Sequence, residues 1–136
     1  MKRLWVLDTN VVVSGLLTPD GVCAALFGHL RAGRFEIAWT PAITREYNEV
    51  LRRSKFGLGA PLVANFLSQL SMGAIVSPKP VPQLPDRDDE PFLAAALATP
   101  DCVLVTGNIK DYPPPLCAGA KVITVREALK LLDEHG

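Results

Sequence analysis

Apolar runs that stop abruptly at polar residues recur along this chain, and the first is residues 4–10, LWVLDTN. Four apolar residues run into Asp8, and a second apolar stretch, 11–17, follows almost at once. A short, continuous apolar run closed by polar groups is typical of a strand buried on both faces of a parallel sheet. The pattern therefore predicts a buried strand with Asp8 at its carboxyl end, followed by a short buried helix over 11–17.

Short apolar strands and helical patterns alternate through the rest of the sequence. Thr40 and Pro41 predict the start of a helix, with Thr as the cap and Pro in the first turn. The apolar run 92–98 predicts a helix buried on all sides, whereas 78–89, which contains four prolines, predicts a loop. The later strands are predicted at 35–39, 74–77, 102–106 and 121–125, and the other helices at 22–32, 41–53, 60–72 and 126–135.

Strands separated by helices predict an α/β fold, a three-layer α/β/α sandwich with right-handed crossovers around a central parallel sheet of about five strands. The length of 136 residues fits a single domain over 1–136. The proline-rich stretch is expected to link elements of that domain, because neither side is long enough to form a domain alone.

The composition is that of a folded protein, with 49% hydrophobic and 21% charged residues. Fourteen basic and fourteen acidic residues give a formal net charge of zero. A polyanionic partner would therefore have to be held by a local basic patch or by metal ions.

Cysteine usage and the N-terminal pattern indicate where the protein works. Cys23, Cys102 and Cys117 contain no CxxC pair, which argues against a disulfide framework or a thiolate zinc site. Asp8 interrupts the first apolar run too early for a signal peptide, and no stretch approaches the ~18 apolar residues of a membrane span. We expect a soluble, cytoplasmic protein with no membrane partner.

Acidic and amide side chains recur where such a sheet would collect ligands, at the carboxyl ends of its strands. Asp8 ends the first strand, Glu46 borders the apolar stripe of its helix, and Asp89 stands at the start of the buried helix. Each has an ordinary alternative, a helix cap for the two aspartates and a surface partner of a nearby cation for Glu46. Asn108 and Asp111 follow the strand at 102–106, where loops favour Asn and Asp in any case.

Taken together, these carboxylates predict a metal site. Several carboxylates can lie close together in a buried site that excludes water only if some of them take up protons or if the site binds cations. Ligand sets made only of oxygen suit Mg²⁺ or Mn²⁺. Such ions activate water and stabilise charge on a phosphodiester, and no histidine, thiol or catalytic serine motif accompanies the acids. The sequence therefore predicts metal-dependent phosphodiester hydrolysis.

Four segments together resemble the PIN-domain family over essentially the whole chain: VLDTN, EYNEVL, DDEPFLAAALA and VLVTGNIKDYP. More narrowly, the chain resembles the toxin branch of the family, akin to the VapC ribonucleases of toxin–antitoxin pairs. The resemblance implies an α/β/α sandwich, an acidic pocket that binds Mg²⁺ or Mn²⁺, and hydrolysis of single-stranded RNA as substrate. It also implies a homodimer and a cognate antitoxin protein that covers the pocket.

The resemblance assigns roles to individual residues. Asp8, Glu46 and Asp89 match the three acidic positions that hold the metal. Thr106 matches the polar residue that braces the site, and Asn10 is expected to support it in the same way.

The chain departs from the family pattern at Asn108, where many members have Asp. An amide can bind a cation or a water molecule through its oxygen but brings no charge. Asp111, three residues on, is the candidate replacement, and both residues are expected to bind or orient water at the metal.

Candidate RNA contacts flank the proposed pocket. Arg87 and Lys110 are expected to bind phosphate groups. Trp39, at a strand end, and Tyr112, in a loop, are candidates for stacking on a base, although core packing is the favoured role for Trp39.

Two other functions fit parts of the pattern. A phosphoacceptor receiver domain also places acids at strand ends, but it needs an Asp after a middle strand and a Lys after the last one. Here the last predicted strand is followed by Arg126, and the strands at 35–39 and 74–77 end without an Asp. A PIN domain with weakened catalysis that serves as an RNA- or protein-binding module is the second alternative, and the neutral Asn108 keeps it open.

Overall fold

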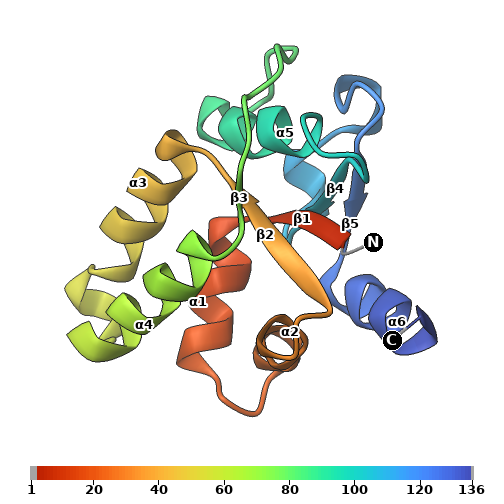
Figure 1. The fold of residues 1–136 in the computed structure, drawn as a ribbon. Helices are drawn as coiled ribbons and strands as arrows, with labels where there is room; N and C mark the ends of the chain where they lie inside the picture. Colours follow the sequence, from red (N-terminus) through yellow and green to blue (C-terminus); the bar gives the residue numbers. More distant parts are fainter. Residues whose placement is uncertain (1–2, 136) are drawn as a thin grey trace.

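Five parallel strands form the central sheet of the computed structural model, which describes residues 3–135 (Figure 1). They are β1 (Arg3–Leu7), β2 (Phe35–Trp39), β3 (Ala74–Ile75), β4 (Val103–Val105) and β5 (Lys121–Ile123). Their order is β3-β2-β1-β4-β5, so β1 lies in the middle. Trp5 pairs with Ile37 of β2 on one side and with Val103 of β4 on the other. The predicted parallel sheet of five strands is confirmed.

Six α-helices belong to the described part of the chain. They are α1 (Thr9–Leu17), α2 (Val22–Arg31), α3 (Pro41–Leu51), α4 (Ala60–Ser71), α5 (Glu90–Ala96) and α6 (Val125–His135). Helix α5 packs on β1, β2 and β4, whereas α2 packs on β2 and against α1 and α6. Figure 1 shows α5 on one side of the strands and α1, α2 and α6 on the other, which gives the expected three layers.

Short 3-10 turns occupy the loops between these elements. They are η1 (Ser54–Phe56), η2 (Arg87–Asp89), η3 (Ile109–Asp111) and η4 (Pro114–Leu116). Two of them, η2 and η3, carry candidate site residues.

The apolar runs of the sequence explain which strands lie inside the fold. Trp5, Val6 and Leu7 are at most 1% exposed, and every residue of β4 is buried. In contrast, β3 lies at the sheet edge, and Ile75 is 61% exposed. The expected strand over 74–77 ends at Ile75, because Pro78 and the prolines that follow cannot donate hydrogen bonds to a sheet.

Capping side chains set the starts of α1 and α3. The Thr40 hydroxyl accepts the N–H of Ile43 at 3.3 Å, with Pro41 in the first turn, as predicted. Helix α1 begins at Thr9, two residues before the predicted 11–17 helix, because Asp8 caps it. The predicted strand over 121–125 ends earlier, at Ile123, because α6 begins at Val125.

The strand order creates a topological switch between β1 and β4. The chain runs outward from β1 to β2 and β3, then crosses back to β4 and continues outward to β5. In open α/β sheets, ligands bind at the carboxyl ends of the strands, where the direction of winding reverses. Asp8 directly follows β1, and Thr106 directly follows β4, so the fold places both residues at this edge.

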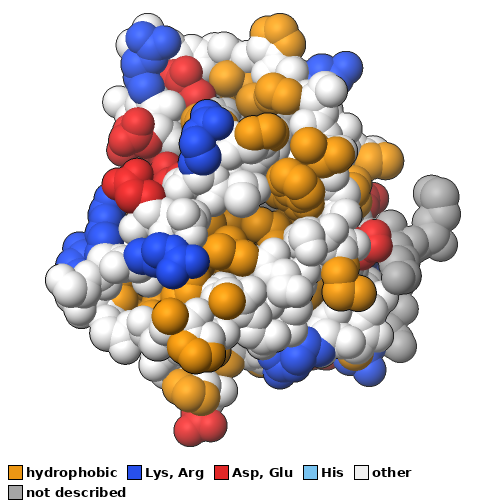
Figure 2. Space-filling model, turned by 60° about the vertical axis from the view of Figure 1, so that its left-hand side comes forward, with side chains coloured by type: hydrophobic (Ala, Val, Ile, Leu, Met, Phe, Trp, Pro, Cys, Tyr) orange, Lys and Arg blue, Asp and Glu red, His pale blue; other side chains and the backbone are white. Residues whose placement is uncertain are grey.

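One face of the molecule is markedly apolar. Figure 2 shows hydrophobic side chains gathered across it, with acidic and basic side chains interspersed along one margin. Over residues 3–135, the exposed large hydrophobic side chains are Leu17, Val22, Leu62, Met72, Ile75 and Ile109.

Within the same range no single helix is long and apolar enough to cross a membrane. Helices α1 and α2 reach the necessary length and apolar character only when taken together, and they are bent by 96° relative to each other.

Candidate active site

Asp8 is fixed at the switch point by its backbone and by its side chain. Its backbone N–H donates to the carbonyl of Val105 at 2.9 Å, which ties the end of β1 to β4. Its Oδ1 accepts the N–H of Thr9 at 2.8 Å and so caps α1. The capping alternative for Asp8 is therefore real, but it occupies only one of the two carboxylate oxygens.

The second oxygen of Asp8, Oδ2, is surrounded by donors. The Thr106 hydroxyl lies at 2.8 Å, the Tyr112 hydroxyl at 3.0 Å and the Asn10 amide nitrogen at 3.4 Å. Asp8 is 4% exposed, and burial raises its pKa. The hydrogen bonds from Thr106, Tyr112 and the Thr9 backbone oppose this rise, so they help to keep the carboxylate ionised.

The position of Tyr112 contradicts the expectation that its ring could stack on a base. The residue is 1% exposed, and its hydroxyl points to Asp8. Burial and the charges of Asp8 and Asp89 raise the pKa of the hydroxyl far above its usual value, so Tyr112 stays protonated and donates. No local pattern in the sequence indicates this contact, because its partner lies 104 positions away.

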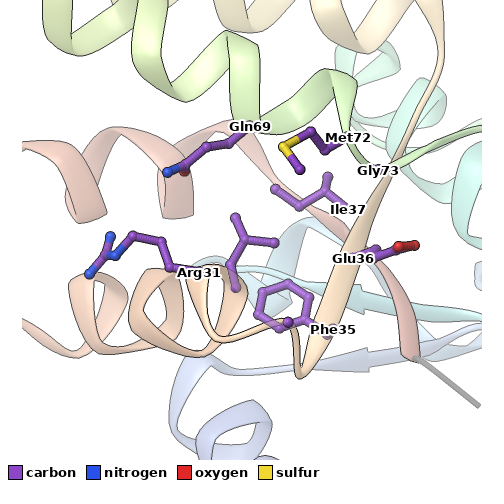
Figure 3. A pocket seen from close by; sticks show the side chains of 9 residues that line it. Arg31, Phe35, Glu36, Ile37, Gln69, Met72 and Gly73 are labelled. Carbon is purple, nitrogen blue, oxygen red and sulfur yellow. The ribbon is translucent and has the colours of Figure 1, made fainter.

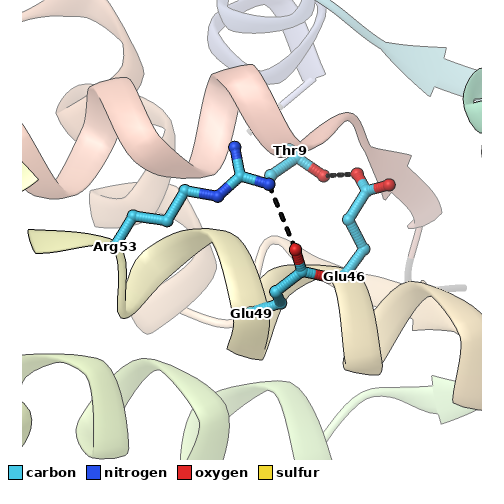
Figure 4. Close-up of polar contacts among 4 residues, drawn as sticks. All are labelled: Thr9, Glu46, Glu49 and Arg53. Atoms are coloured by element: carbon cyan, nitrogen blue, oxygen red, sulfur yellow. Dashed lines mark hydrogen bonds and ion pairs between the residues drawn. The ribbon is translucent and has the colours of Figure 1, made fainter. Parts of the chain in front are cut away.

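Glu46 reaches the site from α3. Its Oε2 accepts the hydroxyl of Thr9, the first residue of α1 (Figure 4). Burial raises the pKa of Glu46, and the charges of Asp8, Asp88 and Glu49 raise it further. Glu49, one turn along the same helix, is instead exposed and pairs with Arg53 at 3.2 Å. Of the two glutamates, only Glu46 therefore faces the crevice.

Asp89 stands at the start of α5, but its side chain makes no capping hydrogen bond. Its Oδ2 is buried and has no hydrogen-bond partner among the described residues. Burial and then the charges of Asp8, Asp111, Asp86 and Glu46 raise its pKa to about 7. An ordinary cap would have paired this oxygen with a backbone N–H, so the capping alternative does not describe Asp89.

The three carboxyl groups form an anionic cluster without a paired cation. The pKa of each is raised, chiefly by burial. Across residues 3–135, no Lys, Arg or His side chain forms an ion pair with Asp8, Glu46 or Asp89. The charge that would balance these groups at neutral pH must therefore be supplied by protons or by a bound cation.

The two candidates for the fourth position differ in their surroundings. Asp111, at the end of η3, is half-buried, and its charge raises the pKa of both Asp8 and Asp89. Asn108 is exposed, and its backbone N–H donates to the Thr106 hydroxyl at 3.0 Å. Of these two residues, Asp111 is the one that acts electrostatically on the cluster.

Asn10 links α1 to the loop that follows β4. Its Oδ1 accepts the N–H of Gly107 at 3.0 Å, while its amide nitrogen approaches Asp8. A Cβ at Gly107 would lie 3.2 Å from this oxygen, so the close approach of the two segments favours glycine there. Asn10 from α1 and Thr106 from the end of β4 thus both contact Asp8 Oδ2.

The candidate RNA-binding residues lie outside the carboxylate cluster. Arg87 in η2 is exposed and lies two residues before Asp89. Lys110 in η3 is also exposed and lies one residue before Asp111. The Arg87 Nε lies 3.7 Å from Glu90. Trp39 is half-buried and packs against the core, which agrees with its favoured role.

The donor set fits a hard divalent cation in its chemistry. Asp8, Glu46 and Asp89 offer only oxygen, and the Asp89 Oδ2 is buried with no partner within the described chain. As the side chains stand, no three His, Cys, Asp or Glu residues between 3 and 135 are close enough together to enclose an ion. A bound cation would therefore have to draw the carboxylates closer together than they are here.

A separate cavity of ≈ 260 Å³ lies between the ends of α2 and α4, beside β2. Figure 3 shows Phe35, Ile37 and Met72 lining it, with the Glu36 side chain directed away from Phe35 and Ile37. None of the clustered carboxylates lines this cavity, so it is distinct from the candidate site.

Residues 5–110 match the family model described as PIN domain. No curated protein gives a significant match to the chain. The matched range includes Asp8, Glu46 and Asp89 and ends at Lys110, so Asp111 and Tyr112 lie beyond it.

Proposed function

This chain belongs to the PIN-domain family, and on that basis we propose that it is a metal-dependent endoribonuclease that cuts single-stranded RNA. PIN domains are generally nucleases and generally use divalent metal ions. The observation that carries the proposal is the cluster of Asp8, Glu46 and Asp89, three buried or half-buried carboxylates with no cation paired to them in the described part of the chain.

Asp8, Glu46 and Asp89 would hold the cation. Hydrogen bonds fix the orientation of the first two carboxylates, whereas the third has an oxygen without a partner among the described residues. When bound, a divalent cation supplies Lewis-acid stabilisation of the charge that develops on the phosphodiester. Asp8 is held in one orientation by donors on both oxygens, and Glu46 is anchored by the Thr9 hydroxyl. Asp89 keeps one oxygen without a partner, which leaves that atom available as a ligand.

The nucleophile in this proposal is water. Its oxygen bonds to phosphorus while the bond from phosphorus to the leaving ribose oxygen breaks, and the proton lost by the water balances the one gained by the leaving oxygen. Asp111 is proposed to orient this water, because its charge already acts on Asp8 and Asp89. The neutral Asn108 favours one bound cation over two, since a second ion would gain no charge from that position.

The finer assignment is to the toxin branch of the family, as in VapC ribonucleases, and it rests on the resemblance of the four motif segments. In that role the protein acts in the cytoplasm as a homodimer. A cognate antitoxin protein silences it by covering the carboxylates, and Arg87 and Lys110 hold the RNA phosphates beside them.

The test is cleavage of a panel of single-stranded RNAs with Mg²⁺, Mn²⁺ or EDTA, comparing the parent, Asp8→Asn and Asp20→Asn. Asp20 is exposed in the turn between α1 and α2, so it is a matched control for the loss of one negative charge. We expect metal-dependent cutting by the parent and by Asp20→Asn, and none by Asp8→Asn. Equal cutting by Asp8→Asn would refute the assignment, whereas metal binding without turnover by the parent would favour the alternative of a binding module.

A further inference from the structure

We infer that Tyr112 is a positioning residue for Asp8, and that its hydroxyl selects the carboxylate oxygen that Asp8 offers to a divalent cation. This inference rests on the proposed function. The ring is buried, and the hydroxyl reaches Asp8 Oδ2 at 3.0 Å from the loop after β4.

The hydrogen bonds around Asp8 divide its two oxygens into different roles. A carboxylate oxygen has about two acceptor sites, and on Oδ2 the hydroxyls of Thr106 at 2.8 Å and Tyr112 at 3.0 Å account for both. The Asn10 amide at 3.4 Å is a longer contact to the same oxygen. Oδ1 accepts only the Thr9 N–H in the described chain. The remaining acceptor site is therefore on Oδ1, and that atom is the one left for a cation.

The segment that carries Tyr112 is itself held in place. Its backbone N–H donates to the Ile109 carbonyl at 3.0 Å, and its own carbonyl accepts the Cys117 thiol at 3.4 Å. A hydroxyl on a fixed ring restrains the carboxylate it contacts, as the outer partners of metal ligands generally do. Without that hydroxyl, Oδ2 regains a free acceptor site, and Asp8 loses one of the contacts that fix its orientation.

The chain contains a matched control for this contact. It has two tyrosines, and the other, Tyr47, is also fully buried. Its hydroxyl donates to the backbone carbonyl of Leu7, the residue before Asp8, and not to a carboxylate. Tyr112→Phe and Tyr47→Phe therefore each remove one buried hydroxyl near the site, but only Tyr112→Phe removes a donor to Asp8.

The experiment is calorimetric titration of Mn²⁺ into the RNA-free parent and both variants at pH 7.5, with thermal denaturation recorded alongside. We expect the Kd for Mn²⁺ to rise by about 10-fold in Tyr112→Phe and to stay within about 2-fold of the parent in Tyr47→Phe. In the cleavage assay, Tyr112→Phe is expected to lower kcat at fixed metal concentration and to leave KM for RNA unchanged. An unchanged Kd in Tyr112→Phe, or an equal rise in both variants, would overturn the inference.

A second measurement keeps both tyrosine hydroxyls in place. Fluorotyrosine labelling of the parent gives two ¹⁹F signals, one for each tyrosine, which the Tyr47→Phe variant assigns. Saturation with Mg²⁺ is expected to shift the Tyr112 signal more than the Tyr47 signal, and the opposite order would overturn the inference. A parent that binds neither Mn²⁺ nor Mg²⁺ would instead refute the proposed metal dependence, so the two failures are distinct.

Discussion

Asp89→Asn is expected to stabilise the metal-free protein above neutral pH, although it removes a residue of the candidate site. Burial and neighbouring carboxylates raise the pKa of Asp89 to about 7, and its buried Oδ2 has no hydrogen-bond partner in the described chain. At pH 8 the folded protein must therefore hold an unfavourable anion, which an amide replaces with a neutral group of the same shape.

The direction of this stability change with pH follows from how many protons the folded and unfolded states bind. In the unfolded chain Asp89 loses its proton near its ordinary pKa of 3.8, whereas in the folded chain its pKa is about 7. Between these values the folded state binds the extra proton, so the parent loses stability as pH rises from about 4 to 7 and levels off above. At about 1.4 kcal/mol per pKa unit, the full difference is about 4 kcal/mol. Because Asp89 is only half-buried, solvent screening reduces this to roughly 2 kcal/mol.

Urea denaturation in EDTA at pH 5 and pH 8 measures the effect. The gain of Asp89→Asn over the parent should be small at pH 5 and roughly 2 kcal/mol at pH 8, and added Mg²⁺ should stabilise the parent but not the variant. Asp20→Asn, at an exposed turn, should stay within about 0.5 kcal/mol of the parent at both pH values. A gain of the same size at pH 5 and pH 8, or a loss of stability at pH 8, would refute the electrostatic reasoning.

Two further predictions each compare a substitution with a control at a second position of the same residue type. Glu46→Gln should lower the rate of RNA cleavage by about 100-fold, which corresponds to a loss of roughly 3 kcal/mol of transition-state stabilisation. Glu49→Gln, on the exposed side of the same helix, should cleave RNA at the rate of the parent. Similar cleavage rates for the two variants would contradict this prediction. Gly73→Ala should destabilise the fold by roughly 2 kcal/mol in a urea titration, because its Cβ would lie 2.1 Å from the Ile37 carbonyl oxygen. Gly28→Ala lies inside α2, where the added Cβ would be 3.9 Å from the Arg31 guanidinium, and it should instead gain roughly 0.5–1 kcal/mol. A loss of stability there would show that the helix propensity argument fails.

The fold could be predicted where local patterns are strong. The strand at 35–39 has its predicted bounds, and the helix after Thr40 begins as its cap and proline indicate. The order of the strands, with β1 at the centre, is not encoded in any local pattern, because it depends on which strands pair over long distances. The edge strand β3 was predicted too long, since an apolar run does not show where a partner strand ends.

The candidate site was predictable only in part for the same reason. Asp8, Glu46 and Asp89 occupy element ends or borders that the apolar pattern locates. Tyr112 lies in the predicted loop GNIKDYPPP, and its position there made it a candidate for stacking on a base. Its hydroxyl instead contacts Asp8, which lies 104 positions earlier in the chain. The sequence shows that the residue is aromatic and polar at one end, but not what it contacts.

The wide separation of these contacts in the chain also determines when the site can exist during protein synthesis. Asp8 is translated before the two hydroxyls that hold it, because these come from Thr106 and Tyr112, 98 and 104 positions later. β4, which pairs with β1 beside Asp8, is likewise translated after all three acidic residues. A nascent chain that has not yet reached Tyr112 therefore carries all three acidic residues without the partners that orient Asp8, so the candidate site is completed only after the segment that follows β4 has been translated and has folded onto Asp8.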